Sequence, residues 1–173
     1  MKKSIVILLL LYSSLSLFAQ SKEAGTDREA IKNYVRTKDT MPAFPQSRDI
    51  EAVKDLLKQY KTAIEKLDLT GTEKLFTSDS QIFETGGSEG TYAHYLEHHL
   101  IPEFKDFTSF KYGDYKVDVK VDGKYAFATE TYTYTLVLVK DETEVKRKGV
   151  ATSVLKKANR EWKIMISHSS SRK

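Results

Sequence analysis

The chain has 173 residues, no cysteine and a formal net charge of +4 at neutral pH, from 28 basic and 24 acidic side chains. The basic and acidic residues are interspersed, as on an ordinary solvated surface, so we expect no nucleic-acid partner. Without cysteine, neither disulfides nor thiolate-bound metal can stabilise the protein, and a chain of this length can form one apolar core instead.

Residues 1–19 have the three parts of a secretory signal peptide. Lys2 and Lys3 form a basic start, residues 5–11 are apolar, and Ala19 is a small residue at the exit. The apolar stretch is shorter than the about 20 residues that span a membrane. We therefore expect cleavage after Ala19 and a periplasmic or secreted protein with no stable membrane span. The alternative is an uncleaved N-terminal anchor.

Residues 20–48 are polar, with few large apolar side chains and with Pro42 and Pro45 close together. This composition predicts a flexible N-terminal arm. The folded domain is expected at 49–173, with Asp49 as the N-cap of its first helix. Apolar residues recur at helical spacing through that helix, which predicts one buried face.

Two more helices and one short strand are expected after the first helix. Residues 72–76 favour a short helix, residues 81–84 a strand, and residues 85–90 a glycine-rich loop. Thr91 is the expected N-cap of a third helix that continues to Pro102. This proline ends the helix or starts one further turn.

The remaining sequence alternates in the way of β-strands, with Asp122 and Gly123 as a hairpin turn signal. Helices followed by a four-stranded antiparallel meander indicate an α+β domain rather than one built from βαβ units. The expected strands cover residues 108–121, 125–140, 145–156 and 161–168.

Side-chain alternation assigns residues to the two faces of this sheet. In the long strand, Tyr132 and Tyr134 share one face, and a row of threonines occupies the other. Such a row suits a solvent-exposed or subunit-facing surface. The threonines are Thr129, Thr131, Thr133 and Thr135, and the last strand is expected to place Trp162, Ile164, Ile166 and His168 on one face.

Five segments together carry the pattern of a known family: residues 68–76, 82–84, 152–156, 162–164 and 168–172. In these segments, and over residues 50–172 as a whole, the chain resembles the SnoaL-like domains of the nuclear transport factor 2-like superfamily. The resemblance implies N-terminal helices packed on a curved antiparallel sheet, forming a cone with an internal pocket. It also implies a homodimer that associates through the sheet.

The superfamily includes ketosteroid isomerases, dehydratases and cyclases as well as non-enzymatic binding and association domains. The resemblance therefore implies where a ligand would bind and leaves the reaction open. Ketosteroid isomerases need an aspartate base in the pocket, and Asp114 and Asp118 are strand aspartates available for that role. Their spacing alone does not place them in the pocket.

One stripe of the third helix is expected to face the sheet and to line the pocket. His99, Glu103 and His168 are the candidate catalytic residues, because a histidine beside a partly desolvated glutamate can act as a general base. The alternative is a structural cluster that satisfies buried polar groups. The expected ligand-binding set, which includes tyrosine hydroxyls as donors, is Tyr92, Leu96, His99, Glu103, Tyr132, Tyr134, Trp162 and His168.

His94 and His98 are four residues apart on the same helix, a spacing that metal ligands use. A structural zinc site needs four ligands, and Glu97 and Glu84 are conceivable further ligands that the sequence does not place beside this pair. The alternative is that both histidines lie on the solvated face of the helix. We therefore expect neither a metal nor another cofactor.

The residues favour an exported domain that binds a small, partly apolar molecule, with no assignable reaction. Ten tyrosines and eight phenylalanines can supply the aromatic wall of such a pocket. One alternative is an isomerase, dehydratase or cyclase that uses the histidine, glutamate and tyrosine groups for acid–base chemistry. The other is a non-enzymatic dimerisation module.

Overall fold

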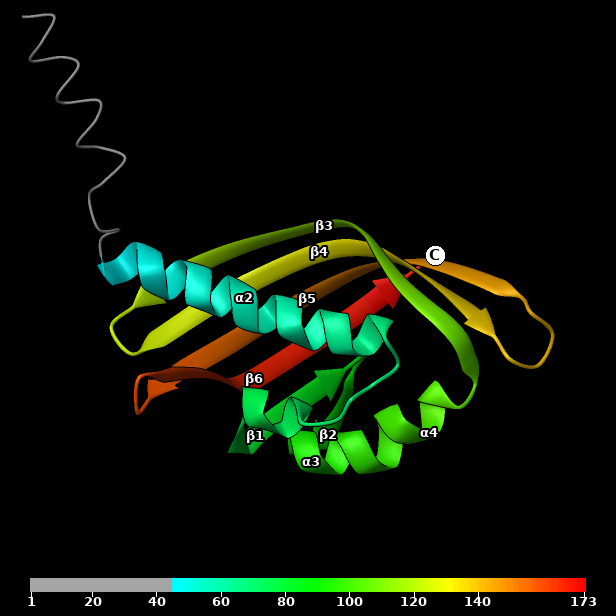
Figure 1. Ribbon diagram of the computed structural model, residues 1–173, viewed down its shortest axis with the longest axis horizontal. Helices are drawn as coiled ribbons and strands as arrows, with labels where there is room; N and C mark the ends of the chain where they lie inside the picture. The colour runs from blue at the N-terminus through cyan, green and yellow to red at the C-terminus, as the bar shows by residue number, and fades with distance from the viewer. Residues whose placement is uncertain (1–44) are drawn as a thin grey trace, which may run out of the picture. The chain divides into compact units, whose positions relative to one another are not determined.

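Helix α2 (Pro45–Glu65) opens the part of the chain that this computed structural model describes, residues 45–173 (Figure 1). The predicted signal peptide and residues 20–44 of the predicted arm lie outside the described residues. The helix starts four residues before Asp49, so the prediction that Asp49 caps it is wrong. Proline suits the first turn of a helix because the amide hydrogen that it lacks has no partner there. Among residues 45–173, no helix combines the length and apolarity needed to cross a membrane.

The carboxylate of Asp49 ties α2 to the sheet. Its Oδ1 accepts hydrogen bonds from the Lys157 ammonium and, at 3.1 Å, from the Trp162 indole nitrogen. The bond from Lys157 is the largest of the effects that lower the pKa of Asp49. The apolar face of α2 packs on the sheet, with Val53 and Leu57 almost fully buried, as helical spacing predicts.

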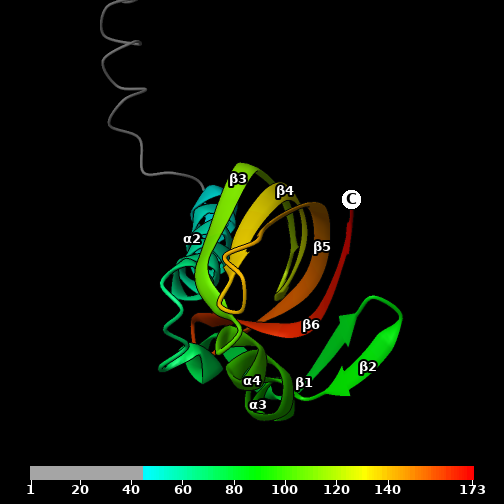
Figure 2. The same cartoon turned by 90° about the vertical axis from the view of Figure 1, so that its right-hand side faces the viewer.

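Six strands form one curved sheet in the order β2-β1-β6-β5-β4-β3, with α2 across its concave side (Figures 1 and 2). The α+β class and the antiparallel meander of the last four strands are confirmed. The first strand pairs parallel to the last, which makes the sheet mixed. The strands are β1 (Phe76–Glu84), β2 (Gly87–Gly90), β3 (Phe107–Asp122), β4 (Tyr125–Leu138), β5 (Glu144–Ala158) and β6 (Glu161–Arg172).

The expected glycine-rich loop at 85–90 contains strand β2 instead. Thr85 and Gly86 have φ angles of 43° and 87°, and together they form a two-residue turn between β1 and β2. Two central residues with positive φ match the twist of a hairpin, so residues 87–90 fold back on β1. The glycines that indicated a loop therefore make a tight turn and a short edge strand.

The predicted second helix is a single 3₁₀ turn, η1 (Thr72–Leu75). The predicted third helix begins at the Thr91 cap, whose Oγ1 accepts a bond from the His94 amide at 3.3 Å. Its middle is a π-helical turn, and Pro102 starts a further α-helical turn rather than ending the helix. The three parts are α3 (Tyr92–Tyr95), η2 (Leu96–Leu100) and α4 (Ile101–Phe104).

Bulges reverse the side-chain alternation within long strands, and one in β6 and one in β3 affect the cavity. In β6, Ile164 pairs with Leu155 and Ile166 with Val154, so Met165 is an extra residue. In β3, two residues lie between the pairs made by Gly113 and Lys116 where β4 has one. An extra residue turns every later side chain to the opposite face. The prediction that Ile166 and His168 share a face with Trp162 and Ile164 is wrong for this reason.

The core lies between the concave face of the sheet and the helices. We expect Leu155→Ala, at a fully buried position on β5, to lower the free energy of unfolding by about 2–5 kcal/mol, because it leaves a cavity. Val150→Ala is the matched control on the same strand, where the side chain is 46% exposed and the change is expected to stay within about 0.5 kcal/mol. Urea unfolding of both variants measures the difference, and equal losses would contradict this placement of the core.

Candidate functional site

A cavity of about 190 Å³ lies between α2, the helical segment α3–α4 and the concave face of the sheet. Its walls are mainly aromatic and aliphatic, and a small number of polar groups reach into it. The basic and acidic side chains that line it are Lys61, Glu84, Glu103 and Glu130, and its serines include Ser153, Ser167, Ser169 and Ser171. This combination is typical of small-molecule sites.

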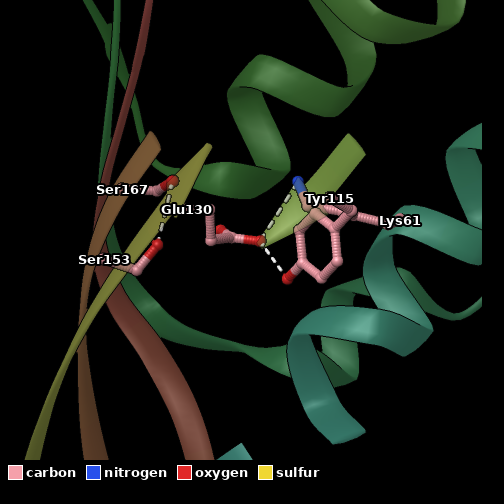
Figure 3. A network of polar contacts seen from close by, with 5 residues as sticks. All are labelled: Lys61, Tyr115, Glu130, Ser153 and Ser167. Atoms are coloured by element: carbon pink, nitrogen blue, oxygen red, sulfur yellow. Dashed lines mark hydrogen bonds and ion pairs between the residues drawn. The ribbon is translucent and has the colours of Figure 1, made fainter. Parts of the chain in front are cut away.

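Lys61 and Glu130, both in the cavity lining, form a buried ion pair (Figure 3). The Lys61 Nζ lies 3.2 Å from Oε2 of Glu130, and the Tyr115 hydroxyl donates to the same oxygen at 2.6 Å. The side chains of Lys61 and Glu130 are 11% and 4% exposed. Because both charges are removed from water, each depends on the other for compensation. Burial lowers the pKa of Lys61, and the attraction of Glu130 opposes that shift.

Aromatic rings enclose the Lys61 ammonium. Its nitrogen lies 4.5 Å from the ring centroid of Tyr112 and 4.4 Å from that of Tyr132. The two rings meet edge to face, with centroids 5.1 Å apart. Both distances are within the range in which the face of an aromatic ring attracts a cation.

Gly149 on β5 allows Tyr132 to occupy this position. A Cβ atom at residue 149 would lie only 2.2 Å from Cε2 of the Tyr132 ring. The ring therefore lies directly against the backbone of β5, which a larger residue would prevent. Farther along the wall, Phe110 and Tyr134 stack with centroids 5.2 Å apart.

A second carboxylate, Glu84 at the end of β1, lies in another part of the cavity lining. Its Oε2 accepts a bond from the Tyr95 hydroxyl at 2.8 Å, and its Oε1 accepts one from Ser169 at 3.5 Å. Glu103 also lines the cavity, although its side chain is largely exposed. Partial burial raises the pKa of Glu103, and the charge of Glu84 adds to that shift.

The serines of β6 face the cavity because of the Met165 bulge. Ser167 lies 3.5 Å from Ser153, oxygen to oxygen, and Ser171 lies 3.0 Å from the Tyr134 hydroxyl. Without the extra residue, the alternate positions of β6 would face the other way. The bulge therefore lines this wall with hydroxyl groups instead of the side chains of Ile166 and His168.

The structure places three members of the predicted ligand-binding set in the cavity lining: Glu103, Tyr132 and Tyr134. Tyr92 instead packs in the core, stacked on Phe76 with centroids 3.6 Å apart, and donates to Thr72 at 2.8 Å. Leu96 and Trp162 are also core residues. The expectation that these three side chains line the pocket is therefore corrected.

The candidate catalytic residues His99, Glu103 and His168 do not come together. His99 pairs with Glu89 at 3.0 Å, with 38% of its own side chain exposed. The π turn shifts the inward stripe of the helix by one position, so that Leu100 is buried in place of His99. His168 is exposed and faces away from the cavity, as a consequence of the β6 bulge.

His94 and His98 are both exposed, with ring centroids 4.4 Å apart. His94 Nδ1 lies 3.0 Å from the carbonyl oxygen of Glu89. Within residues 45–173, no group of three histidine, aspartate or glutamate side chains is arranged to hold a metal ion. Asp114 and Asp118, the strand aspartates, are exposed side chains that do not line the cavity.

Sequence reasoning missed the polar groups that define the cavity, above all Lys61, Glu84 and Glu130. Two of them carried a usable signal. Lys61 follows Leu57 by four residues and precedes Ile64 by three, so it stands on the apolar stripe of its helix. Glu130 shares the buried face of the long strand with Tyr132. A charged residue on the apolar face of a helix, and another on the buried face of a strand, together indicate a buried ion pair. Neither pattern alone shows which residue the charge pairs with.

The family model of the SnoaL-like domain matches residues 53–172. No curated protein matches the sequence. Solved structures with the same fold include a nuclear transport factor 2-like superfamily protein from Salmonella enterica serovar Typhimurium. It is 20% identical, with a TM-score of 0.64, and the match covers 71% of this chain and 90% of that one.

Two further solved structures are similar at lower identity. A hexachlorocyclohexane dehydrochlorinase from Novosphingobium barchaimii is 13% identical, with a TM-score of 0.63 and coverage of 73% of this chain and 88% of its own. A ketosteroid isomerase-like protein from Erwinia carotovora atroseptica is 15% identical, with a TM-score of 0.64 and coverage of 75% and 99%. Identities this low show a shared fold alone.

Removing one member of the buried ion pair should leave the other charge uncompensated. We expect Lys61→Met to lower the free energy of unfolding by about 3–5 kcal/mol, and the double variant Lys61→Met/Glu130→Gln to lose less than the two single changes together. Lys54→Met is the control, because Lys54 and Glu51 form an exposed pair that contributes at most about 0.5 kcal/mol. Strictly additive losses in urea unfolding would contradict the coupling.

Alkaline pH should destabilise the domain through its buried tyrosines. Burial raises the pKa of each of six phenols, which ionise near pH 10 in the unfolded chain. Their contribution is therefore complete below about pH 10 and is lost as the pH rises further, by up to about 1.4 kcal/mol per tyrosine for each pH unit. The six are Tyr60, Tyr92, Tyr95, Tyr112, Tyr115 and Tyr132.

The lowered pKa of Lys61 makes the free energy of unfolding rise with pH, but this is the effect of one group and the tyrosines are six. Urea unfolding across this pH range, with tyrosinate absorbance recorded on the folded protein, measures the effect. An unfolding free energy that stays constant while these phenols ionise in the folded state would contradict it.

Proposed function

The chain belongs to the SnoaL-like domain family, and we propose that its domain binds a small, partly apolar molecule in the cavity of the cone. The observation that carries the proposal is the cavity itself, with aromatic walls and a few polar groups reaching into it. Sites of this kind fix the position of a ligand through their polar groups and gain affinity from its apolar part.

The size of the cavity limits the ligand. An apolar cavity of about 150 Å³ accommodates benzene, so a volume of about 190 Å³ suits a molecule about the size of one substituted ring. The hydroxyl groups of the serines and of Tyr134 offer both donors and acceptors along one wall. The ligand that fits is a single-ring or similarly compact molecule with a polar substituent.

Proton transfer within the same cavity is a second candidate function. Its support is the Glu84 carboxylate, which lies in the cavity lining with hydrogen bonds from Tyr95 and Ser169. A carboxylate held by hydrogen-bond donors beside an apolar ligand can serve as a general base. In this candidate Glu84 replaces the histidines as the base, because His99 and His168 do not line the cavity.

Native mass spectrometry of the protein purified from the organism that encodes it tests the binding proposal. We expect a retained small molecule on the wild type, its loss in Ser169→Phe, which places a ring in the cavity, and its retention in His168→Phe on the opposite face of the same strand. If both variants retain the small molecule, it does not bind in the cavity. If neither the wild type nor His168→Phe retains one, the result would favour a dimerisation module over a binding domain.

The same spectra test the predictions that lie outside the cavity. The mass of the assembly gives the number of chains and so tests the homodimer. The mass of the single chain shows whether residues 1–19 have been removed. A bound molecule that loses water or another small group during incubation with the wild type, but not with Glu84→Gln, would favour base-catalysed elimination over binding alone.

A further inference from the structure

The cavity contains two carboxylates that are each held by a tyrosine hydroxyl. Glu130 accepts from Tyr115 at 2.6 Å, and Glu84 accepts from Tyr95 at 2.8 Å. A carboxylate has more acceptor sites than one hydroxyl fills, so each can take a further donor. For Glu130 that donor is the ammonium of Lys61, at 3.2 Å.

Glu84 has no such cation from the chain. Within residues 45–173, none of the ion pairs includes it, and its other hydrogen bond comes from Ser169. Lys61 is the one basic side chain among the described residues that line the cavity, against three carboxylates. Because Lys61 is already paired with Glu130, the remaining charge of the lining is negative. Charge held away from water is stabilised when an opposite charge compensates it.

The surroundings of Lys61 show that aromatic rings and a carboxylate of this cavity stabilise an ammonium group. Its ammonium lies about 4.5 Å from the ring centroids of Tyr112 and Tyr132, beside a carboxylate that also accepts a tyrosine bond. Cages of aromatic rings bind organic ammonium groups through the attraction between the cation and the ring faces. Glu84 likewise accepts a bond from a tyrosine, Tyr95. Aromatic rings also line the cavity to which Glu84 belongs, those of Phe110 and Tyr134 among them.

We propose that the ligand of this cavity is a small organic cation, whose ammonium group pairs with Glu84 while its apolar part lies against the aromatic wall. This inference rests on the proposed ligand-binding function and names the class of ligand. The pairing would repeat, with a ligand atom, the arrangement that Lys61 and Glu130 form with chain atoms. An anionic ligand would meet Glu84 without compensation, so the site selects by charge.

Three probes of one size test the charge selectivity: benzylamine, benzyl alcohol and benzoate, which are a cation, a neutral molecule and an anion near neutral pH. Isothermal titration of the wild type should show benzylamine binding at least about tenfold more tightly than benzyl alcohol, and benzoate more weakly than either. Ser169→Phe should abolish binding of benzylamine. This comparison uses only wild-type protein for its main result, so it does not depend on how Glu84 variants fold.

Glu84→Gln keeps the shape of the side chain and removes its charge. It should weaken benzylamine by about tenfold or more and leave benzyl alcohol unchanged. Asp118→Asn is the matched control, a carboxylate on an exposed position of the sheet that does not line the cavity, and it should change neither affinity.

The outcomes separate this inference from the function on which it rests. If benzyl alcohol binds as tightly as benzylamine and Ser169→Phe blocks the binding of both, the cavity binds ligands but has no preference for a cation, and the inference is overturned. If benzylamine does not bind to the wild type, the inference is overturned, whatever molecule native mass spectrometry finds. Preference for benzylamine that survives Glu84→Gln would also overturn the pairing with Glu84.

Discussion

The buried pair of Lys61 and Glu130 connects the two layers of this domain. Lys61 comes from α2 and Glu130 from the middle of β4, so their contact fixes how the helix lies across the curved sheet (Figure 3). Neither charge is exposed enough for water to replace its partner, and the Tyr115 hydroxyl and the rings of Tyr112 and Tyr132 complete the surroundings. Separating Lys61 from Glu130 would leave each charge without compensation, so the pair holds this part of the lining in place.

Backbone irregularities decide which side chains face the cavity. One extra residue in β3 turns Tyr115 toward Glu130, and one in β6 turns the serines inward and His168 outward. The π turn in the helical segment buries Leu100 and leaves His99 at the surface beside Glu89. Bulges and π turns each insert one residue into a regular pattern, and such insertions are frequent near functional sites. The serines that β6 contributes to the cavity lining are thus a product of a local departure from regular geometry, whereas Lys61 and Glu130 come from a regular helix and a regular strand.

The SnoaL-like fold supplies the cavity, and the side chains of this chain determine its space and its charge. A cone formed by helices on a curved sheet leaves space where the concave face carries small residues, as β5 does at Ala151 and Ser153. The fold is shared with proteins of very different description, so it does not identify a reaction. In this chain, the carboxylate of Glu130 is paired internally with Lys61, and Glu84 is the carboxylate to which we assign the ligand. The proposed cation follows from that asymmetry rather than from the fold.

The sequence by itself determined the class of the domain, most of its elements and the buried face of the long strand. Helical spacing from Val53 to Ile64 and strict alternation from Ala126 to Leu136 are local periodic signals, and local signals survive in a single sequence. The family resemblance added the cone. Of the predicted ligand-binding residues, Glu103, Tyr132 and Tyr134 line the cavity, and the two tyrosines come from the strand whose alternation is uninterrupted.

Only the tertiary structure decided which polar groups meet. Alternation in β6 pointed His168 inward, but a single extra residue at Met165 reversed the face of everything after it. Glu84, Tyr95 and Ser169 come from three separate segments, and no spacing within one segment places them side by side. The physical reason is the same in each case. Which face a side chain occupies depends on every residue pairing before it, and pairing between strands is a long-range property that the local pattern does not contain.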